Sequence, residues 1–215
     1  MSRLMSRFAL PLAVVLFGIF AMTASAGNVD LTGVLANPSF EGGNGPGGCP
    51  TNWTCISGNG PTSYTVTANQ YTAGSDGLAS GIVPGGTHAG TCPYPWEGAC
   101  AFGQFNLGTY QAGNTYTLTF WVGTPKTLPY NGTTPVGTVQ TFRVYFVGVV
   151  NGGFNQMSAT DIVAPAPGQW KQYTITFTPT GLAVGQGIGV EFFVNGGANN
   201  LVADIDFAAP ACSCP

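Results

Sequence analysis

Charged side chains are scarce in this sequence, which limits what the protein can bind. Only 6% of the 215 residues are charged, with 5 Lys and Arg against 8 Asp and Glu. Arg3 and Arg7 lie in the first segment of the chain, so three cations remain for everything that follows. Nucleic acids and anionic membrane surfaces are bound by clustered Lys and Arg. The sequence therefore predicts no nucleic-acid partner and argues against an anionic membrane surface.

The motifs of common enzymes are missing too. His88 is the only histidine, and the chain has no Gly-x-Ser-x-Gly elbow, no His-Glu-x-x-His pair and no glycine-rich phosphate loop. A nucleophilic triad and a zinc site both draw on histidine, so both are disfavoured. His88 has no evident partner in the sequence, and we expect it to be a surface residue.

Long apolar runs are absent after the first 26 residues. The run at residues 8–22 follows two arginines and precedes a small-residue cleavage pattern at 24–26. These features are typical of a secretory signal peptide, and the run is short for a bilayer span. We predict a signal peptide at 1–26, one domain at 27–215 and no transmembrane segment. The predicted location is secreted or extracellular, with the periplasm or the cell surface as variants.

Cysteine is present in an even number, and all of it follows the predicted signal peptide. The six residues are Cys49, Cys55, Cys92, Cys100, Cys212 and Cys214. An even count after a signal peptide predicts disulfides in an oxidising compartment. We expect local pairs between Cys49 and Cys55 and between Cys92 and Cys100. A direct bridge within Cys-Ser-Cys at 212–214 would be strained, so the partners of that pair stay open.

Helical periodicity is also absent beyond the first segment. The 33 glycines and 16 prolines separate short runs in which Thr, Val, Tyr and Phe recur, and such runs are typical of strands. The clearest runs are 115–122, 139–150, 172–178 and 188–194, and the weaker ones are 29–35, 53–57, 64–67, 101–106 and 201–207. They predict an all-β protein, a single jelly-roll β-sandwich of about eight or nine antiparallel strands stapled by disulfides.

Strand parity predicts a second side-chain face. If the even-numbered residues of 115–122, 142–147 and 190–194 fill the core, the odd-numbered ones point away from it. The outward set places aromatic rings next to hydrogen-bonding groups: Trp121, Arg143, Tyr145, Glu191 and Phe193. Such a cluster is typical of a binding surface, and flat rings can stack on sugars. The alternative is that residues 74–98 cover this face and make its aromatics a satellite core.

Residues 74–98 lack periodicity and are predicted to form a long loop pinned by Cys92. Trp96 and Glu97 lie in it, and aromatic residues on loops often contact ligands. Trp96 is therefore a further candidate for ligand binding. The alternative is a tryptophan packed over a disulfide.

Four segments resemble carbohydrate-binding modules of families four, nine and twenty-two, which have a galactose-binding-domain-like jelly roll. They are Asn37-Pro-Ser-Phe-Glu41 with Trp53-Thr54, Gln104 to Val122, Gln169 to Phe177, and Val202 to Phe207. The resemblance covers most of the chain after residue 26. It implies the jelly-roll fold and the non-catalytic binding of a carbohydrate or glycan. Ala203 departs from the family pattern, which has an aspartate at that place.

The resemblance also implies a structural calcium ion, with Glu41, Asp204 and Asp206 as the matching ligands. Calcium prefers several hard oxygen ligands, which carboxylates and loop carbonyls supply. The first and last strands of a jelly roll lie close together, so these acids could converge. The alternative is that Glu41 caps a turn and the two aspartates are solvated.

The sequence thus predicts a secreted, non-catalytic protein that binds carbohydrate through an aromatic-bearing sheet face, as a monomer or with weak self-association. The main alternative is a structural or surface-matrix protein without a sugar site. An enzyme is the third possibility, with Asp76, Glu97, Asp161 and Glu191 as available carboxyl groups. The same fold occurs in the calcium-dependent Stig-type terpenoid-indole cyclases. Their opening is similar to the Asn-x-x-Phe-Glu segment here, and they use a buried acid in an aromatic pocket.

Overall fold

The computed structural model describes residues 26–42, 49–57, 62–65, 71–72, 83–91, 100–127, 141–194 and 204–206. Its strands are β1 (Asn28–Asp30), β2 (Thr54–Ser57), β3 (Thr62–Thr65), β4 (His88–Thr91), β5 (Cys100–Thr109), β6 (Thr115–Thr124), β7 (Thr141–Val150), β8 (Gly153–Val163), β9 (Gln169–Phe177), β10 (Gly187–Val194) and β11 (Asp204–Asp206). Two single turns of 3-10 helix, η1 (Thr32–Val34) and η2 (Gly181–Ala183), complete the regular elements of these residues. The all-β prediction is confirmed. Within the described ranges no helix is long and apolar enough to cross a membrane.

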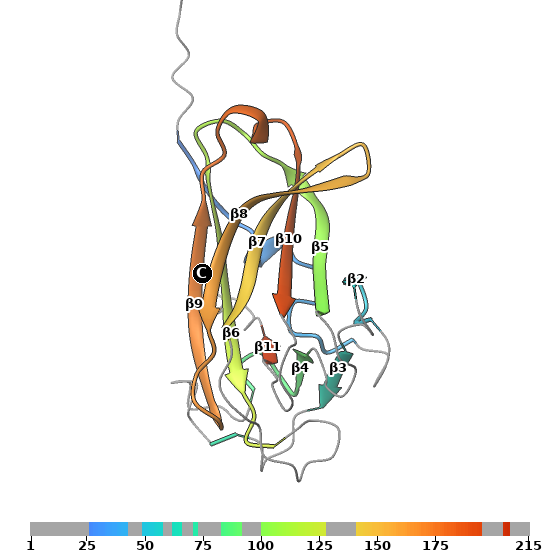
Figure 1. Ribbon diagram of the computed structural model, residues 1–215, viewed down its shortest axis with the longest axis vertical. Coiled ribbons are helices and arrows are strands. Elements are labelled where there is room, and N and C mark those ends of the chain that lie inside the picture. Colours follow the sequence, from blue (N-terminus) through green and yellow to red (C-terminus); the bar gives the residue numbers. More distant parts are fainter. Residues whose placement is uncertain are drawn as a thin grey trace, which may run out of the picture.

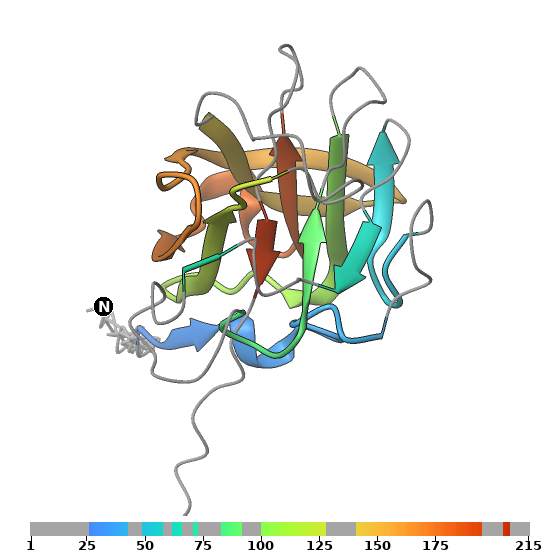
Figure 2. The same ribbon diagram turned by 90° about the horizontal axis from the view of Figure 1, so that it is seen from below.

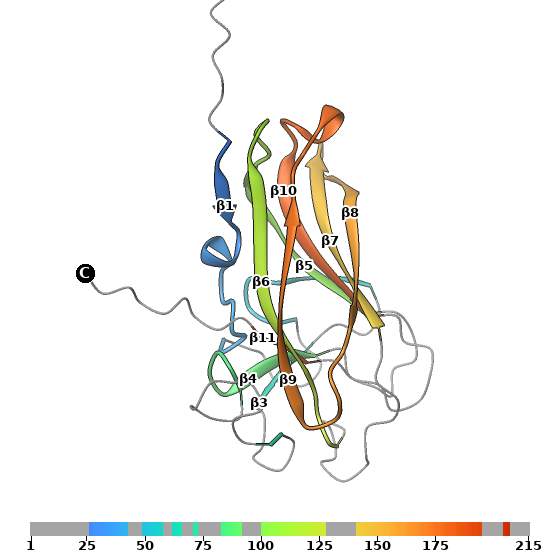
Figure 3. The ribbon, with the colours of Figure 1, turned by 90° about the vertical axis from the view of Figure 1, so that its left-hand side faces the viewer.

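The strands form two sheets that pack face to face (Figure 1 and Figure 3). In the first, here called the β6 sheet, β6 pairs with β9 along one edge and with β1 and β11 along the other. β4 and β3 continue this sheet beyond β11, and Figure 2 shows β11, β4 and β3 side by side. The second, here called the β10 sheet, has the order β2-β5-β10-β7-β8. The ladder between β1 and β6 is parallel and the other strand ladders are antiparallel, so the predicted sandwich is confirmed.

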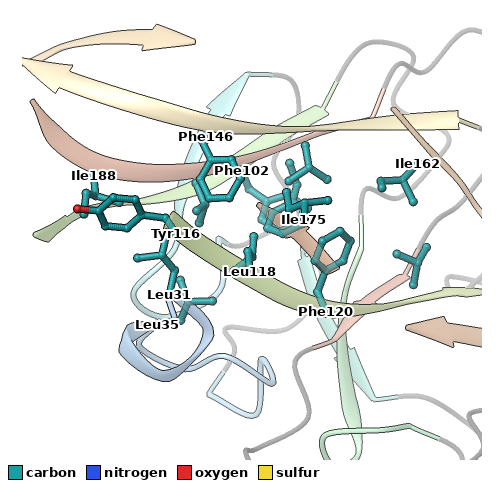
Figure 4. Packing of buried hydrophobic residues seen from close by; sticks show 14 of the residues in the cluster. Leu31, Leu35, Phe102, Tyr116, Leu118, Phe120, Phe146, Ile162, Ile175 and Ile188 are labelled. Carbon is teal, nitrogen blue, oxygen red and sulfur yellow. The ribbon is translucent and has the colours of Figure 1, made fainter. Parts of the chain in front are cut away.

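Alternating side chains of facing strands fill the space between the sheets. The buried set from β6 is Tyr116, Leu118, Phe120 and Val122, as the parity of this run predicts. The set from β7 and β10 is Val144, Phe146, Val190 and Phe192. Figure 4 shows Leu118 and Phe120 projecting from one strand toward Phe102 and Phe146. Burial of one such side chain contributes roughly 1.5–3 kcal/mol, so the alternation in sequence decides which face of each strand turns inward.

The segment before β2 is held by an aromatic stack and a disulfide. Phe40 is fully buried and stacks on Trp53 with the ring centroids 4.8 Å apart. Cys49 and Cys55 are bonded, with their Cα atoms 5.9 Å apart, which confirms the predicted local pair. Glu41 follows Phe40 directly, so the buried ring fixes the point at which the carboxylate emerges.

β7 and β8 form a hairpin that the sequence predicts only in part. Asn151 and Gly152 close it with positive φ values of 49° and 79°, as a type I′ turn requires. β8 is largely exposed, and its polar residues give no alternation by which a strand could be recognised. Its ladder with β7 is regular except for one shift between Phe146 and Val147. This shift is a β-bulge.

Candidate functional site

The outer face of the β10 sheet carries a carboxyl group that is buried although it points away from the core. Val190 and Phe192 of β10 enter the core, so Glu191 between them points outward. Glu191 lies directly opposite Tyr145 of β7. Only 7% of Glu191 and 8% of Tyr145 are exposed. Glutamate is rarely buried without a partner, so this position is a candidate functional site.

Two glycines beside Glu191 make room for an aromatic ring. Gly103 of β5 lies opposite Glu191, and a Cβ at that position would lie 2.9 Å from Cζ of Phe105. A Cβ at Gly189 would lie 2.5 Å from Cδ1 of the same ring. The ring of Phe105 therefore lies against both glycines and covers the sheet next to the carboxyl group.

Phe154 of β8 meets the ring of Phe105 from the far side. Their ring centroids are 4.2 Å apart, with 34° between the ring planes. β10 and β7 lie between β5 and β8, so in a flat sheet the two backbones would be about 14 Å apart. The contact therefore requires the end of the hairpin to fold back over the sheet, and Figure 1 shows the hairpin crossing β10 and β5. Phe154 itself stays half exposed.

We call this surface the acid face. Its members are Phe105, Arg143, Tyr145, Phe154, Gln156, Glu191 and Phe193. Four of them, Arg143, Tyr145, Glu191 and Phe193, belong to the ligand-binding set predicted from strand parity. The structure brings these four together on one face, and their role in binding stays a prediction.

Burial and one hydrogen bond set the protonation of Glu191. Burial raises the pKa of Glu191 above the ordinary value of 4.5, because the ionised form loses its water. A hydrogen bond with the side chain of Gln156 lowers the pKa in part, but the net shift is upward. The other carboxyl side chains that the structure describes, Asp30, Glu41 and Asp161, are all exposed. Among the described carboxyl groups, Glu191 is thus the one best placed to keep its proton above the pH range in which a glutamate usually ionises.

An ion pair borders the acid face. Arg143 donates from Nε to Oδ1 of Asp161 at 2.5 Å and from Nη2 to Oδ2 at 3.0 Å. The hydrogen bonds with Arg143 lower the pKa of Asp161, while those with Asp161 and Tyr145 raise the pKa of Arg143. Both groups are therefore charged near neutral pH. Asp161 is a poor proton donor for this reason, although the sequence left it among the available acids.

Trp121 does not belong to this face. It lies on β6, in the other sheet, and is only 8% exposed. It forms a second buried cluster with Tyr71, Val83, Ala89 and Trp170. The expectation that Trp121 shares an exposed face with Tyr145 is wrong, because β6 and β7 belong to different sheets. Val83, from the predicted loop at 74–98, and Tyr71, which precedes that loop, pack with Trp121. This cluster corresponds to the alternative of a satellite core, with Tyr71 as an addition from outside the loop.

Glu41 lies in the segment before β2 and is held by hydrogen-bond donors. Oε1 accepts from the backbone N–H groups of Thr87 and His88 at 2.7 and 2.9 Å. Oε2 accepts from Thr87 Oγ1 at 3.0 Å and lies 2.9 Å from His88 Nδ1. His88, whose partner was not evident from the sequence, is thus paired with Glu41, and its side chain is 28% exposed. The contacts make Glu41 an anchor between the opening segment and β4.

The described residues leave the calcium prediction untested. Both oxygens of Glu41 face N–H and O–H donors, an arrangement that hydrogen bonding explains without a cation. Among the described side chains no three of His, Cys, Asp and Glu lie close enough together to hold a metal. The side chains of Asp204 and Asp206 on β11 lie outside the described residues. Calcium binding stays a prediction that rests on the family resemblance.

Several predicted residues lie outside the described part of the chain. They are Asp76, Cys92, Trp96, Glu97, Cys212, Cys214 and the side chain of Cys100. Three members of the acid face were missed by the sequence analysis: Phe105, Phe154 and Gln156. The sequence did contain an indication for Phe105, because Phe105 lies two residues after Gly103 in a predicted strand and therefore on the same face. Phe154 and Gln156 had none, because β8 itself was not predicted.

The sequence matches the HpiC1-like family, described as HpiC1 cyclase, over residues 33–207. A comparison with curated proteins finds no match. The structure is similar to two cyclase structures from Fischerella sp. TAU. One is a Stig cyclase in complex with (3Z)-3-(1-methyl-2-pyrrolidinylidene)-3H-indole, at 18% identity, covering 80% of this chain and 92% of that chain, with a TM-score of 0.61.

The second is a cyclase in complex with 4-(1H-indol-3-yl)butan-2-one, at 17% identity, with the same coverage of 80% and 92% and a TM-score of 0.60. A family 22 xylan-binding domain from Paenibacillus barcinonensis aligns over 79% of this chain and 93% of its own, at 11% identity and a TM-score of 0.46. The two cyclases confirm the sandwich fold that the sequence predicts. The family match spans well over half of the sequence, and the chain therefore belongs to the HpiC1-like cyclase family.

Proposed function

We propose that this protein is a cyclase that binds a small indole-bearing alkene on the acid face and protonates it with Glu191. The observation that carries the proposal is the outward but buried carboxyl group of Glu191 in an aromatic setting. Membership of the cyclase family supports it, as do the indole compounds bound to the two Fischerella structures. The alternative of non-catalytic carbohydrate binding has no comparable observation in its favour.

The raised pKa of Glu191 supports a role as general acid. A carboxyl group that keeps its proton above the ordinary glutamate range can still donate it near neutral pH. Proton transfer to an alkene carbon leaves a carbocation on the neighbouring carbon. The π electrons of a second double bond or of the indole then form the new carbon–carbon bond. Loss of a proton from the cyclised cation back to the carboxylate restores the acid, so substrate and product are isomers.

The aromatic members of the acid face suit the cationic step. Phe105 lies over the sheet beside Glu191, and Tyr145 lies directly opposite it. An aromatic ring attracts a cation through its quadrupole, and the attraction is stronger where water is excluded. Exclusion of water also prevents the carbocation from being captured as an alcohol. The proposed role of these rings is to hold the cation until the ring closes.

The protein is also proposed to work outside the reducing cytoplasm. The disulfide between Cys49 and Cys55 supports this location, because such bonds persist in oxidising compartments.

The test is the conversion of 3-geranylindole by the wild type and by Glu191→Gln. We expect the wild type to give products of unchanged mass and new retention time, and Glu191→Gln to be slower by at least about 100-fold. Asp30→Asn is the matched control, since it makes the same carboxyl-to-amide change on exposed β1. Mass spectrometry after chromatography measures the product, and circular dichroism checks folding.

Two results would overturn the proposal. One is conversion by Glu191→Gln at the wild-type rate. The other is a wild type that leaves 3-geranylindole unchanged but is retarded in gels cast with xylan or galactan, which would support carbohydrate binding instead.

A further inference from the structure

The outward direction of Gln156 depends on the β-bulge in β8. Phe146 of β7 pairs with Ser158, while the next residue, Val147, pairs with Gln156. Met157 is the extra residue between the two pairs. In a regular ladder Met157 would face Val147, and Gln156 would point to the core side. The bulge therefore turns Gln156 to the outer face, as bulges near functional sites often do.

Gln156 reaches the acid from two strands away. Glu191 lies on β10 and Gln156 on β8, with β7 between them, so their backbones are about 10 Å apart. Val147 is paired with Gln156, and Tyr145 is paired with Glu191. The two long side chains therefore meet over β7 between these residues and form a hydrogen bond.

The hydrogen bond is the one polar side-chain contact that the described residues give Glu191. The position opposite it on β5 is Gly103, which has no side chain, and the ring of Phe105 lies beside it. Tyr145 on β7 is hydrogen-bonded to Arg143. A buried carboxyl group with a single polar neighbour takes its orientation from that neighbour.

Resting on the proposed function, we propose that Gln156 is a positioning residue for Glu191. Its side-chain amide donates to one carboxyl oxygen, so the proton resides on the other oxygen and is directed toward the substrate. The bulge at Met157 is the structural device that makes this contact possible.

The same hydrogen bond tunes the acid. An amide N–H stabilises the ionised carboxylate more than the neutral acid, so it opposes the effect of burial on the pKa of Glu191. The other titratable or charged groups that face Glu191 are Tyr145 and Arg143 on β7 and Asp161 on β8, while β5 contributes none among the described residues. Replacement of Gln156 leaves all three in place.

The chain offers a direct way to observe this acid. It contains three glutamates, Glu41, Glu97 and Glu191. Selective carbon-13 labelling of the glutamate carboxyl carbons therefore gives three titrating signals. The signal of Glu191 is assigned by its loss in Glu191→Gln, and that of Glu41 by its loss in Glu41→Gln.

The test compares the wild type with Gln156→Met, which keeps the length of the side chain and removes the donor. We expect the Glu191 signal to titrate at higher pH in Gln156→Met, with the Glu41 signal unchanged. The kcat for 3-geranylindole should fall about tenfold, because the carboxyl group of Glu191 no longer directs its proton toward the substrate. Gln172→Met on exposed β9 is the matched control and should change neither quantity.

Gln156→Asn is a second variant, too short to reach across β7, and should reproduce both changes. The proposal is overturned if Glu191 titrates identically in the wild type and in both Gln156 variants. This failure is distinct from a failure of the proposed function. Conversion by Glu191→Gln would remove the acid itself from the reaction, whereas an inactive Glu191→Gln with an unaffected Gln156→Met would remove only the positioning role.

Discussion

Glu41 and Glu191 are the same amino acid in opposite environments. The side chain of Glu41 is 40% exposed and accepts four hydrogen bonds from Thr87 and His88. Burial by itself would raise the pKa of Glu41, but these hydrogen bonds together lower it. Glu191 is buried and has one hydrogen bond, so its pKa is raised. The comparison shows that the number of donors, set against burial, decides whether a glutamate acts as an anchor or keeps a proton.

The carboxyl groups of Glu41 and Glu191 make the free energy of unfolding depend on pH in opposite directions. The contribution of Glu41 is present above the ordinary glutamate pKa of 4.5 and is lost as the pH falls through its lower folded pKa. For Glu191 the folded state holds the proton more tightly than the unfolded chain. Its contribution is therefore full below pH 4.5 and is lost as the pH rises through its higher folded pKa.

The largest expected effect comes from the apolar part of the Glu41 anchor, which is the buried ring of Phe40. Phe40→Ala should lower the free energy of unfolding by about 3–5 kcal/mol, because it removes a fully buried ring that stacks on Trp53. Urea denaturation followed by circular dichroism measures the loss. Phe154→Ala on the acid face is the control, and with half of its surface exposed it should cost less than about 1 kcal/mol. Equal losses would contradict the contrast between the two regions.

A smaller effect tests the polar part of the anchor, which is the hydrogen-bonded carboxylate of Glu41. Glu41→Gln should lower the free energy of unfolding at pH 7 by about 1 kcal/mol, a value reduced because the carboxylate is partly exposed. The difference from the wild type should shrink as the pH falls below 4.5, where the wild-type carboxylate gains its proton. Urea denaturation at pH 7 and at several lower pH values gives both numbers. A constant difference at every pH would show that the charge of Glu41 does not matter.

The smallest expected effect has the opposite sign. Glu191→Gln should raise the free energy of unfolding at neutral pH by about 0.5–1 kcal/mol, because an amide carries no charge to bury. Wild-type stability should also decline as the pH rises above the ordinary glutamate range, and the variant should lack this decline. Thermal unfolding across pH 4 to 8 compares the two slopes. Parallel curves for the two proteins would place Glu191 in water rather than in the apolar setting described above.

The sequence predicts best where one strand alternates regularly. In β6 the residues 116, 118, 120 and 122 fill the core as expected, because one side-chain period of two is enough to fix the buried face. The same rule correctly turns Tyr145 and Glu191 away from the core. In contrast, the run predicted at 29–35 contains only the short β1, after which the chain turns into η1.

The rest of the site depends on contacts that parity cannot supply. Trp121 is buried because Val83, from the aperiodic segment 74–98, and Tyr71, which precedes that segment, pack against it. His88 meets Glu41 across 47 positions of sequence. Gln156 reaches the acid face only because a bulge shifts the register of β8, and a polar strand gives no hydrophobic pattern in which a bulge could be seen.

The β7–β8 hairpin gathers Arg143, Tyr145, Phe154 and Gln156 within a single stretch of chain. Its Asn-Gly turn and its long antiparallel ladder set its shape locally. A mutant library confined to this hairpin would alter the side chains around Glu191 and leave β10, the strand of Glu191 itself, unchanged. If Glu191 is the proton donor, as proposed above, substrate preference could be varied by exchanging this one continuous peptide without changing the strand that carries the acid.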